Sequence, residues 1–309
     1  MKFAQASSNI KTGHLKAPVV EMDGNKERVF EEMFASALRR EPGSVIDYWC
    51  RYPKHEFLSY LVERKDVLLH GSNESNIKFL VPIRVSTSDV WWEQMEAVYA
   101  FSDGILPIIY AILDRNEYKG CLKDDCFWAP DEKGVATKYY YFSLNIQALV
   151  KRVWRDGTVY IVDRKPFERL KDDDGNYLEE WVSREAAQVL AKVRVSPSDF
   201  PFLTKVLIHT ENAAQRERPT VEVAPRVYDS YVGRYELASG VILTVTKESD
   251  GLYVQAMRYR PFKLYPASET EYFIKQADLS LTFVKNTFGP VMQAIVNMDD
   301  QTLTAKRVY

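Results

Sequence analysis

The sequence predicts an α+β protein in which a mixed N-terminal domain is followed by a small all-β domain. Its 309 residues suit two domains of ordinary size, and 46% hydrophobic with 27% charged residues is typical of a globular chain. Apolar residues recur at helical spacing after residue 25 and then form scattered short runs up to about residue 210. Beyond residue 230 only short strand-like runs remain, each closed by turn residues.

We expect four segments along the chain. Residues 1–24 are polar and form an N-terminal segment that we expect to be mobile. Residues 25–210 form the mixed α+β domain, and residues 211–227 form a polar linker that carries two prolines. Residues 228–309 form the all-β domain.

The mixed domain is predicted to begin with a helix near Asn25. A buried strand at residues 67–69 runs into His70-Gly71-Ser72, and another strand covers residues 97–101. Residues 105–113 are apolar almost throughout and predict a buried helix. Further strands are expected at residues 139–144, 158–162, 180–183 and 190–195.

Eight short strand-like runs fill the C-terminal domain. Turn residues such as Ser249-Asp250-Gly251 and Asp299-Asp300 stand where hairpin loops are expected. Eight short antiparallel strands predict a small closed barrel. The runs are residues 232–236, 241–248, 252–256, 261–265, 272–274, 279–285, 291–298 and 302–307.

Composition excludes several classes of protein. A net charge of -2 gives no overall attraction to nucleic acid, and no apolar run is long enough to cross a membrane. The first residues lack the apolar core of a signal peptide. Three scattered cysteines do not form a disulfide framework, so we expect a reducing, cytoplasmic location.

Common catalytic motifs are missing. The four histidines are scattered and Cys121 and Cys126 have no second pair, so no metal is expected. There is no Gly-x-Ser-x-Gly elbow, no Ser-x-x-Lys in a persuasive setting, and no glycine-rich phosphate loop. Hydrolases of those types and nucleotide-binding folds with such loops are therefore disfavoured.

One constellation remains. A strand ends in His70-Gly71-Ser72, Tyr99 lies in the next strand, Tyr110 follows eleven residues later, and Glu180-Trp181 begins a late strand. This order and spacing resembles the poly(ADP-ribose) polymerase-like branch of the ADP-ribosyltransferases, over about residues 65–200. The resemblance implies a split-sheet α+β domain, with NAD as the substrate and no metal.

The resemblance implies roles for the acidic residue and the histidine. Glu180 would stabilise the positive charge that develops on the ribose when the bond to nicotinamide breaks, and would help to deprotonate the acceptor. His70 would bond a ribose hydroxyl. Glu179 is the alternative to Glu180 if the strand register differs by one residue.

The other matched positions would bind the cofactor. Gly71 would hold the nicotinamide carboxamide through its backbone, and Ser72 would add a hydroxyl contact. Tyr99 and Tyr110 would stack on the nicotinamide ring, with Tyr99 also counted in the catalytic set. For Gly71, Ser72 and both tyrosines, ordinary turn and core positions are the alternative.

Two positions depart from the family pattern. Pro107 stands where members often carry a small hydroxyl residue, and Leu106 replaces a common lysine. These changes disfavour elongation of a polymer. The resemblance therefore implies a mono-ADP-ribosyltransferase or an NAD glycohydrolase, with protein, nucleic acid or water as the acceptor.

The C-terminal domain has its own resemblance. Residues 231–236, 243–246 and 251–255, continued by residues 262–266 and the final Lys306-Arg307-Val308, look like a domain of unknown function that follows penicillin-binding-protein-like serine hydrolases. In that family the domain is a lipocalin-like accessory β-structure without chemistry of its own. A ligand or partner at the barrel, in an otherwise non-catalytic nucleotide- or partner-binding protein, is the alternative function.

Overall fold

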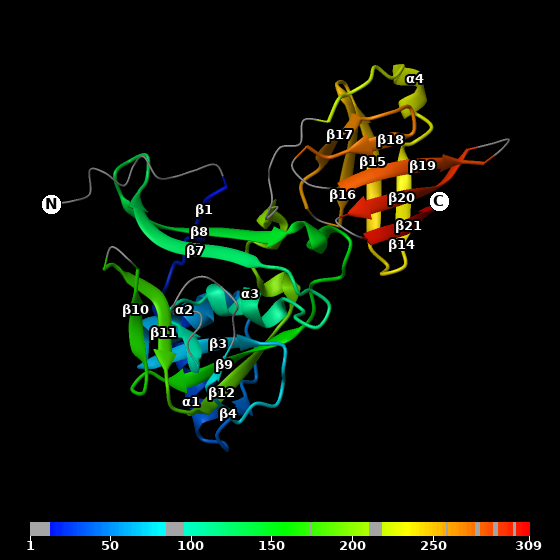
Figure 1. The fold of residues 1–309 in the computed structure, drawn as a ribbon. Coiled ribbons are helices and arrows are strands. Elements are labelled where there is room, and N and C mark those ends of the chain that lie inside the picture. The colour runs from blue at the N-terminus through cyan, green and yellow to red at the C-terminus, as the bar shows by residue number, and fades with distance from the viewer. Residues whose placement is uncertain are drawn as a thin grey trace. The chain divides into compact units, whose positions relative to one another are not determined.

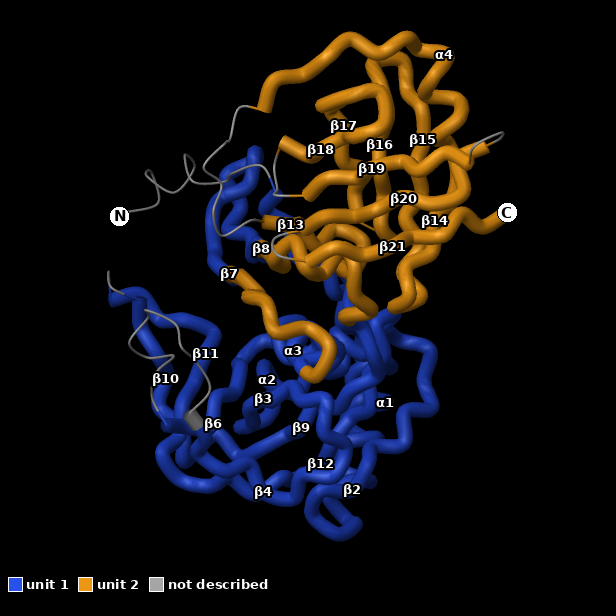
Figure 2. Tube along the Cα trace, turned by 45° about the vertical axis from the view of Figure 1, so that its right-hand side comes forward, with its two compact units in different colours: residues 1–115, 126–140, 154–201 blue, residues 116–125, 141–153, 202–309 orange. Residues whose placement is uncertain are grey.

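The computed structural model describes residues 13–84, 96–172, 175–209, 218–257, 259–275, 279–286, 290–298 and 301–309. Within them the chain forms two compact units, coloured differently in Figure 2. The first unit comprises residues 1–115, 126–140 and 154–201, and the second comprises residues 116–125, 141–153 and 202–309. Trp91 and Trp92, which could have covered an acceptor, lie outside the described residues.

The expected α+β class was wrong, because the described residues are mainly β (Figure 1). Strands form over residues 122–130 and 136–145, although the sequence pattern had indicated only a short strand at residues 139–144. Four α-helices are described, of which the last is a single turn: α1 (Gly24–Leu38), α2 (Lys54–Arg64), α3 (Leu106–Ile112) and α4 (Pro225–Tyr228).

The first unit is built on a sheet of nine strands. Seven follow one another in the order β10-β11-β6-β3-β9-β12-β2, while β4 pairs with β12 and β5 with β6. All these pairs are antiparallel except β12 with β2. The strands are β2 (Ser44–Val45), β3 (Val67–Ser72), β4 (Phe79–Leu80), β5 (Ile83–Arg84), β6 (Glu96–Phe101), β9 (Gly157–Asp163), β10 (Glu168–Lys171), β11 (Tyr177–Ser183) and β12 (Ala187–Val195).

Helix α3 packs unusually closely on this sheet. A Cβ atom on Gly71 of β3 would lie 2.0 Å from the carbonyl oxygen of Pro107, and one on Gly157 of β9 would lie 1.9 Å from that of Ala111. Only glycine leaves room for a helix backbone at these distances. The two glycines therefore let α3 lie directly against β3 and β9.

A second sheet contains β1 (Leu15–Lys16), β7 (Leu122–Pro130), β8 (Ala136–Asn145) and β13 (Leu207–His209). Strands β7 and β8 have residues in both units. In the second unit β13 runs parallel to the end of β8, and β8 leads into the short 3-10 helix η3 (Ile146–Leu149). Two further 3-10 turns are η4 (Pro197–Asp199) and η5 (Leu203–Lys205).

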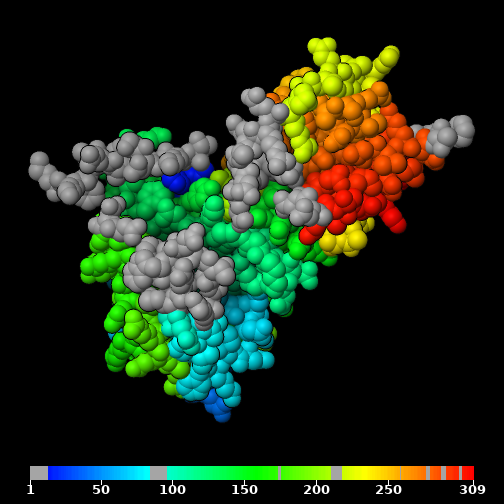
Figure 3. All heavy atoms as spheres, viewed as in Figure 1, coloured from blue at the N-terminus to red at the C-terminus, as the bar shows by residue number. Residues whose placement is uncertain are grey.

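The C-terminal barrel is closed, as the sequence predicted. Eight strands pair antiparallel with their neighbours in chain order, and the last pairs with the first. Figure 3 shows the atoms of these strands, coloured from yellow to red, lying directly against one another. The strands are β14 (Gly233–Leu237), β15 (Ile242–Glu248), β16 (Gly251–Ala256), β17 (Phe262–Pro266), β18 (Glu271–Phe273), β19 (Leu279–Lys285), β20 (Val291–Met298) and β21 (Gln301–Val308).

Candidate functional site

The structure brings His70 to Tyr99, but through the backbone of the tyrosine. His70 Nδ1 lies 2.7 Å from the Tyr99 carbonyl oxygen, and its ring lies near that of Tyr160. Burial lowers the pKa of His70, and the bond to the Tyr99 carbonyl offsets this only in part. The imidazole is therefore a neutral, half-buried group that ties β3 to β6.

The remaining predicted residues do not gather around His70. Phe101 pairs with both Leu69 and Glu180, so these three side chains share one face of the sheet. Tyr99 is two residues before Phe101 and lies on the same face, whereas His70 is next to Leu69 and lies on the opposite face. The Tyr99 side chain packs against the apolar cluster that contains Val182, on the same face. Because side chains alternate along a strand, no pocket combines the histidine with the tyrosine and the acid.

Tyr110, Gly71 and Ser72 also have local structural contacts. The ring of Tyr110 stacks on Phe101 at 5.1 Å between centroids. The space beside Gly71 is filled by the backbone of α3, and the Ser72 hydroxyl accepts a hydrogen bond from the Glu74 amide at 3.1 Å. These contacts favour the core and turn interpretations of the three residues.

A different set of polar residues does come together in the first unit. Asp103, fully surrounded by protein, accepts hydrogen bonds through Oδ1 from the amides of Ile105 and Leu106 at 2.7 and 2.8 Å. Its Oδ2 accepts from Lys138 Nζ at 2.7 Å and from the Tyr140 hydroxyl at 2.6 Å. The carboxylate thus joins the start of α3 to β8.

Glu179 extends this arrangement to the edge of the sheet. Its Oε1 lies 3.1 Å from Lys138 Nζ, and its Oε2 accepts a hydrogen bond from the Ser102 hydroxyl at 2.6 Å. Arg169 reaches the same oxygen at 3.3 Å. We call Ser102, Asp103, Lys138, Tyr140 and Glu179 the Asp103 cluster.

Opposite charges keep the cluster ionised. Burial by itself would raise the pKa of Asp103, but the Lys138 charge and the hydrogen bonds outweigh it and hold the pKa below 3.8. Burial would likewise lower the pKa of Lys138, but the carboxylates of Asp103 and Glu179 raise it above 10.5. Lys138 is therefore a permanent cation near neutral pH and acts as a hydrogen-bond donor, not as a base.

Sequence reasoning missed this cluster as a unit. Asp103 lies just before the predicted helix at residues 105–113 and has no predicted partner, and Glu179 was considered only as the alternative to Glu180. Lys138 and Tyr140 lie on a strand whose alternation gave no sign of a distant carboxylate. The signal that could have found the cluster is Asp103-Gly104 before an apolar helix, which predicts an N-terminal cap but not its outer partners.

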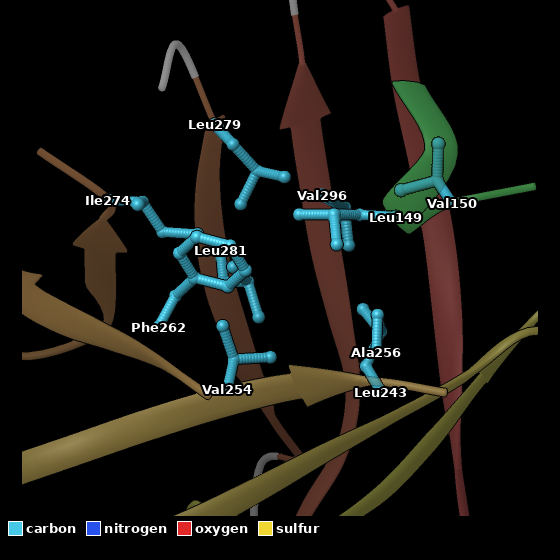
Figure 4. A pocket seen from close by; sticks show the side chains of 10 residues that line it. All are labelled: Leu149, Val150, Leu243, Val254, Ala256, Phe262, Ile274, Leu279, Leu281 and Val296. Carbon is cyan, nitrogen blue, oxygen red and sulfur yellow. The ribbon is translucent and has the colours of Figure 1, made fainter. Parts of the chain in front are cut away.

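The interior of the barrel is filled by apolar side chains. The cavity that remains is about 10 Å³, roughly the space of one water molecule. Two of its lining residues, Leu149 and Val150, come from η3 and the residue after it, and lie within the second unit with the barrel strands (Figure 4). The other lining residues are Leu243, Val254, Ala256, Phe262, Ile274, Leu279, Leu281 and Val296.

A larger hollow lies on the outside of the barrel domain. It is an open groove of about 590 Å³, lined by the segment from Val221 to Pro225 and by Tyr228. Val221 is 44% exposed, and its amide donates to the Pro266 carbonyl at the end of β17 at 3.0 Å. The groove therefore borders a segment outside the barrel strands that is hydrogen-bonded to the end of β17.

Comparison with known proteins gives one domain match and one curated relative. Residues 217–307 match the model of a domain of unknown function, DUF3471. Penicillin-binding protein 4* of Bacillus subtilis (strain 168) is 29% identical over 126 residues. The match covers 40% of this chain, and the chain spans only a quarter of the length of that relative.

These findings overturn part of the sequence interpretation. Neither match is to an ADP-ribosyltransferase, so the resemblance to that family was wrong. The NAD-dependent transferase or glycohydrolase function was wrong with it, as was the alternative of an inactive module on that fold. The split-sheet domain is replaced by the nine-stranded sheet described above.

The described residues limit other interpretations. No helix among them is long and apolar enough to cross a membrane. They contain no group of three or more His, Cys, Asp and Glu residues placed to hold a metal ion. Cys50, Cys121 and Cys126 form no disulfide with one another.

Proposed function

We propose that this chain is an accessory, partner-binding protein of penicillin-binding-protein systems, and that its barrel docks a serine hydrolase of that type through its outer surface. The observation that carries the proposal is the filled barrel. With a cavity of only about 10 Å³, the interior has no room for a small-molecule ligand. The open groove beside Val221 is left as the larger recognition surface of this unit.

The likeness to the Bacillus subtilis relative supports the choice of partner. That protein carries the matched segment in a chain about four times as long as the match, so there the segment shares a chain with much other structure. Its name says that it binds penicillin. Interfaces between two domains of one chain resemble transient interfaces between separate proteins. A domain that packs against a serine hydrolase domain in one chain therefore has a surface that can bind such a domain in another chain.

The groove has features of a protein-docking edge. Backbone that lies outside the paired strands of a sheet can pair with an added strand, and exposed apolar side chains then supply contact area. Val221 meets both conditions, and Tyr228, whose ring lies edge-on to Tyr272, gives the groove an aromatic wall. Aromatic residues are enriched at the centres of protein interfaces.

Binding of the full chain to the purified Bacillus subtilis relative tests the proposal. We expect a complex whose affinity falls at least about tenfold, or about 1.4 kcal/mol, in Val221→Asp. The matched control is Val135→Asp, another exposed valine, which lies at 58% exposure in the first unit and should leave the affinity unchanged. Absence of a complex, or equal losses in both variants, would overturn the proposal.

The compartment and the cofactor remain predictions from the sequence. A cytoplasmic location rests on the three cysteines, which form no disulfide with one another. We attach no role for NAD to the proposed function, because the family that implied NAD is not the one matched.

A further inference from the structure

Ser102 has an unusual pair of hydrogen bonds for a serine at a strand end. Its hydroxyl donates to Glu179 Oε2 at 2.6 Å, and its oxygen accepts from Trp181 Nε1 at 2.9 Å. The carboxylate oxygen, which Arg169 also contacts at 3.3 Å, accepts the hydrogen bond of the hydroxyl, and the indole N–H orients the hydroxyl oxygen. A serine whose proton already lies on a hydrogen bond to a base has the arrangement of an activated nucleophile.

A cation lies on the other side of the same carboxylate. Lys138 Nζ contacts Glu179 Oε1 and Asp103 Oδ2, which use two of its three N–H groups. Within the described ranges no third oxygen accepts from this ammonium group, and the Trp128 ring lies 5.9 Å away. The third N–H is therefore available to a negative oxygen that forms near Ser102.

The group is reachable from solvent. The side chains of Lys138 and Glu179 are 15% and 14% exposed, and Trp128 beside the lysine is 62% exposed. Asp103, in contrast, is buried and holds the lysine in place. All of these residues belong to the first unit, so the arrangement does not depend on the barrel.

We propose that Ser102 is the nucleophile of an acyl-ester hydrolase site, with Glu179 as its general base and Lys138 as the donor to the oxyanion. This activity goes beyond the docking function proposed for the barrel and does not rest on it. The substrate class is a carboxylic ester with a small acyl group, because Lys138 and Glu179 are only 15% and 14% exposed and leave little room for a large one.

The reaction balances without any further reagent except water. Glu179 Oε2 takes the Ser102 proton while Oγ forms a bond to the ester carbonyl carbon, and the carbonyl oxygen becomes an oxyanion facing Lys138. The bond from carbon to the leaving alkoxy oxygen then breaks, and the alcohol departs with the proton from Glu179. Water, deprotonated by Glu179, attacks the acyl-serine, the acid leaves, and Ser102 recovers its proton.

A fluorophosphonate probe and p-nitrophenyl acetate test this site in the full chain. We expect the probe to label Ser102, as located by mass spectrometry of peptides, and the chain to release p-nitrophenol above the rate in buffer. Ser102→Ala should lose both. Glu179→Gln should slow ester hydrolysis by about 100-fold, the contribution of a general base.

Ser183→Ala is the matched control, since this serine lies on β11 and bonds only to the backbone of Glu185. It should keep the labelling and the rate. Circular dichroism shows whether each variant is folded. Labelling of Ser102 in the wild-type chain tests the proposal even if a variant fails to fold. An unlabelled Ser102 in the folded wild-type chain, or an unchanged rate in folded Ser102→Ala, would overturn the proposal.

Discussion

The barrel and the first unit differ in the kind of side chain that fills their interiors. The barrel interior is lined by aliphatic and aromatic side chains around a cavity of about 10 Å³. The first unit buries an ionised carboxylate, Asp103, and surrounds it with four donors. One interior is stabilised by apolar area, and the other contains a charge that is stable only while its partners stay in place.

The comparison teaches where function can arise in each unit. A filled apolar interior offers no polar group to a ligand, so the barrel can act only through its outer surface. A cluster of charges at the edge of a sheet keeps reactive oxygens and a fixed cation close to solvent. We therefore assign docking to the barrel and chemistry to the Asp103 cluster.

The largest expected effect is the loss of the buried cation. Lys138→Met leaves the Asp103 carboxylate without its charge partner, which should cost about 3–5 kcal/mol in the free energy of unfolding. Urea denaturation of the full chain measures this. In Lys247→Met, which removes an exposed ion pair of the barrel domain with Asp229, the change should stay below about 1 kcal/mol. Equal effects would mean that the cluster is not a buried charge network.

A cavity in the barrel should cost nearly as much. Leu281→Ala removes a buried side chain that lines the small cavity, for which losses of about 2–5 kcal/mol are typical. Because the barrel is filled, we expect about 3 kcal/mol in the same urea assay. A loss below about 1 kcal/mol would show that the interior is loosely packed and could admit a ligand.

The close approach of α3 predicts a smaller loss. Gly71→Ala places a methyl group 2.0 Å from the Pro107 carbonyl oxygen, and such overpacking costs about 1–3 kcal/mol. Gly24→Ala is the control, since no atom lies within 4 Å of the added methyl group. Differential scanning calorimetry should show a lower Tm for the first variant and an unchanged or slightly higher Tm for the second. Equal Tm values would contradict the close packing of α3.

The smallest effect concerns pH. The folded pKa of Asp103 is lowered, so its contribution is present above about 3.8 and is lost as pH falls through the folded value. The pKa of Lys138 is raised, so its contribution is present below 10.5 and is lost as pH rises through the folded value. The pair therefore contributes equally to the unfolding free energy of the wild-type chain between about pH 5 and 9. In Lys138→Met the cation no longer opposes burial, so the pKa of Asp103 rises, and the stability lost relative to wild type should become smaller as the pH falls to about 4. A loss that is larger at pH 4 than at pH 7 would contradict these shifts.

The barrel was predictable because its information is local. Alternation of apolar residues in runs such as Leu252–Ala256, and turn residues such as Ser249-Asp250, fix strands and hairpins without reference to distant parts of the chain. When eight strands pair antiparallel in chain order, the sheet closes into a barrel if the last strand pairs with the first, and closure leaves no unpaired edge. The resemblance of this segment to an accessory β-domain pointed to the same residues as the matched domain.

The candidate site was not predictable for the opposite reason. Asp103, Lys138 and Glu179 are brought together by the order of strands in a sheet, which no spacing in the sequence reveals. His70, Tyr99 and Glu180 had suggestive spacing, but register places the histidine on the other face of the sheet. A short motif can match a family in the order of its residues without matching it in the register of the paired strands. A register shift of one residue moves a side chain to the opposite face of the sheet.

Hydrogen exchange of the full chain, with and without the purified Bacillus subtilis relative, tests the central claim that the barrel acts from its outside. We predict slower exchange at the amides of Glu222, Val223 and Ala224, which border the open groove, and unchanged exchange in the strands that line the interior. Protection confined to interior strands such as β19, or no protection anywhere in the domain, would contradict the account.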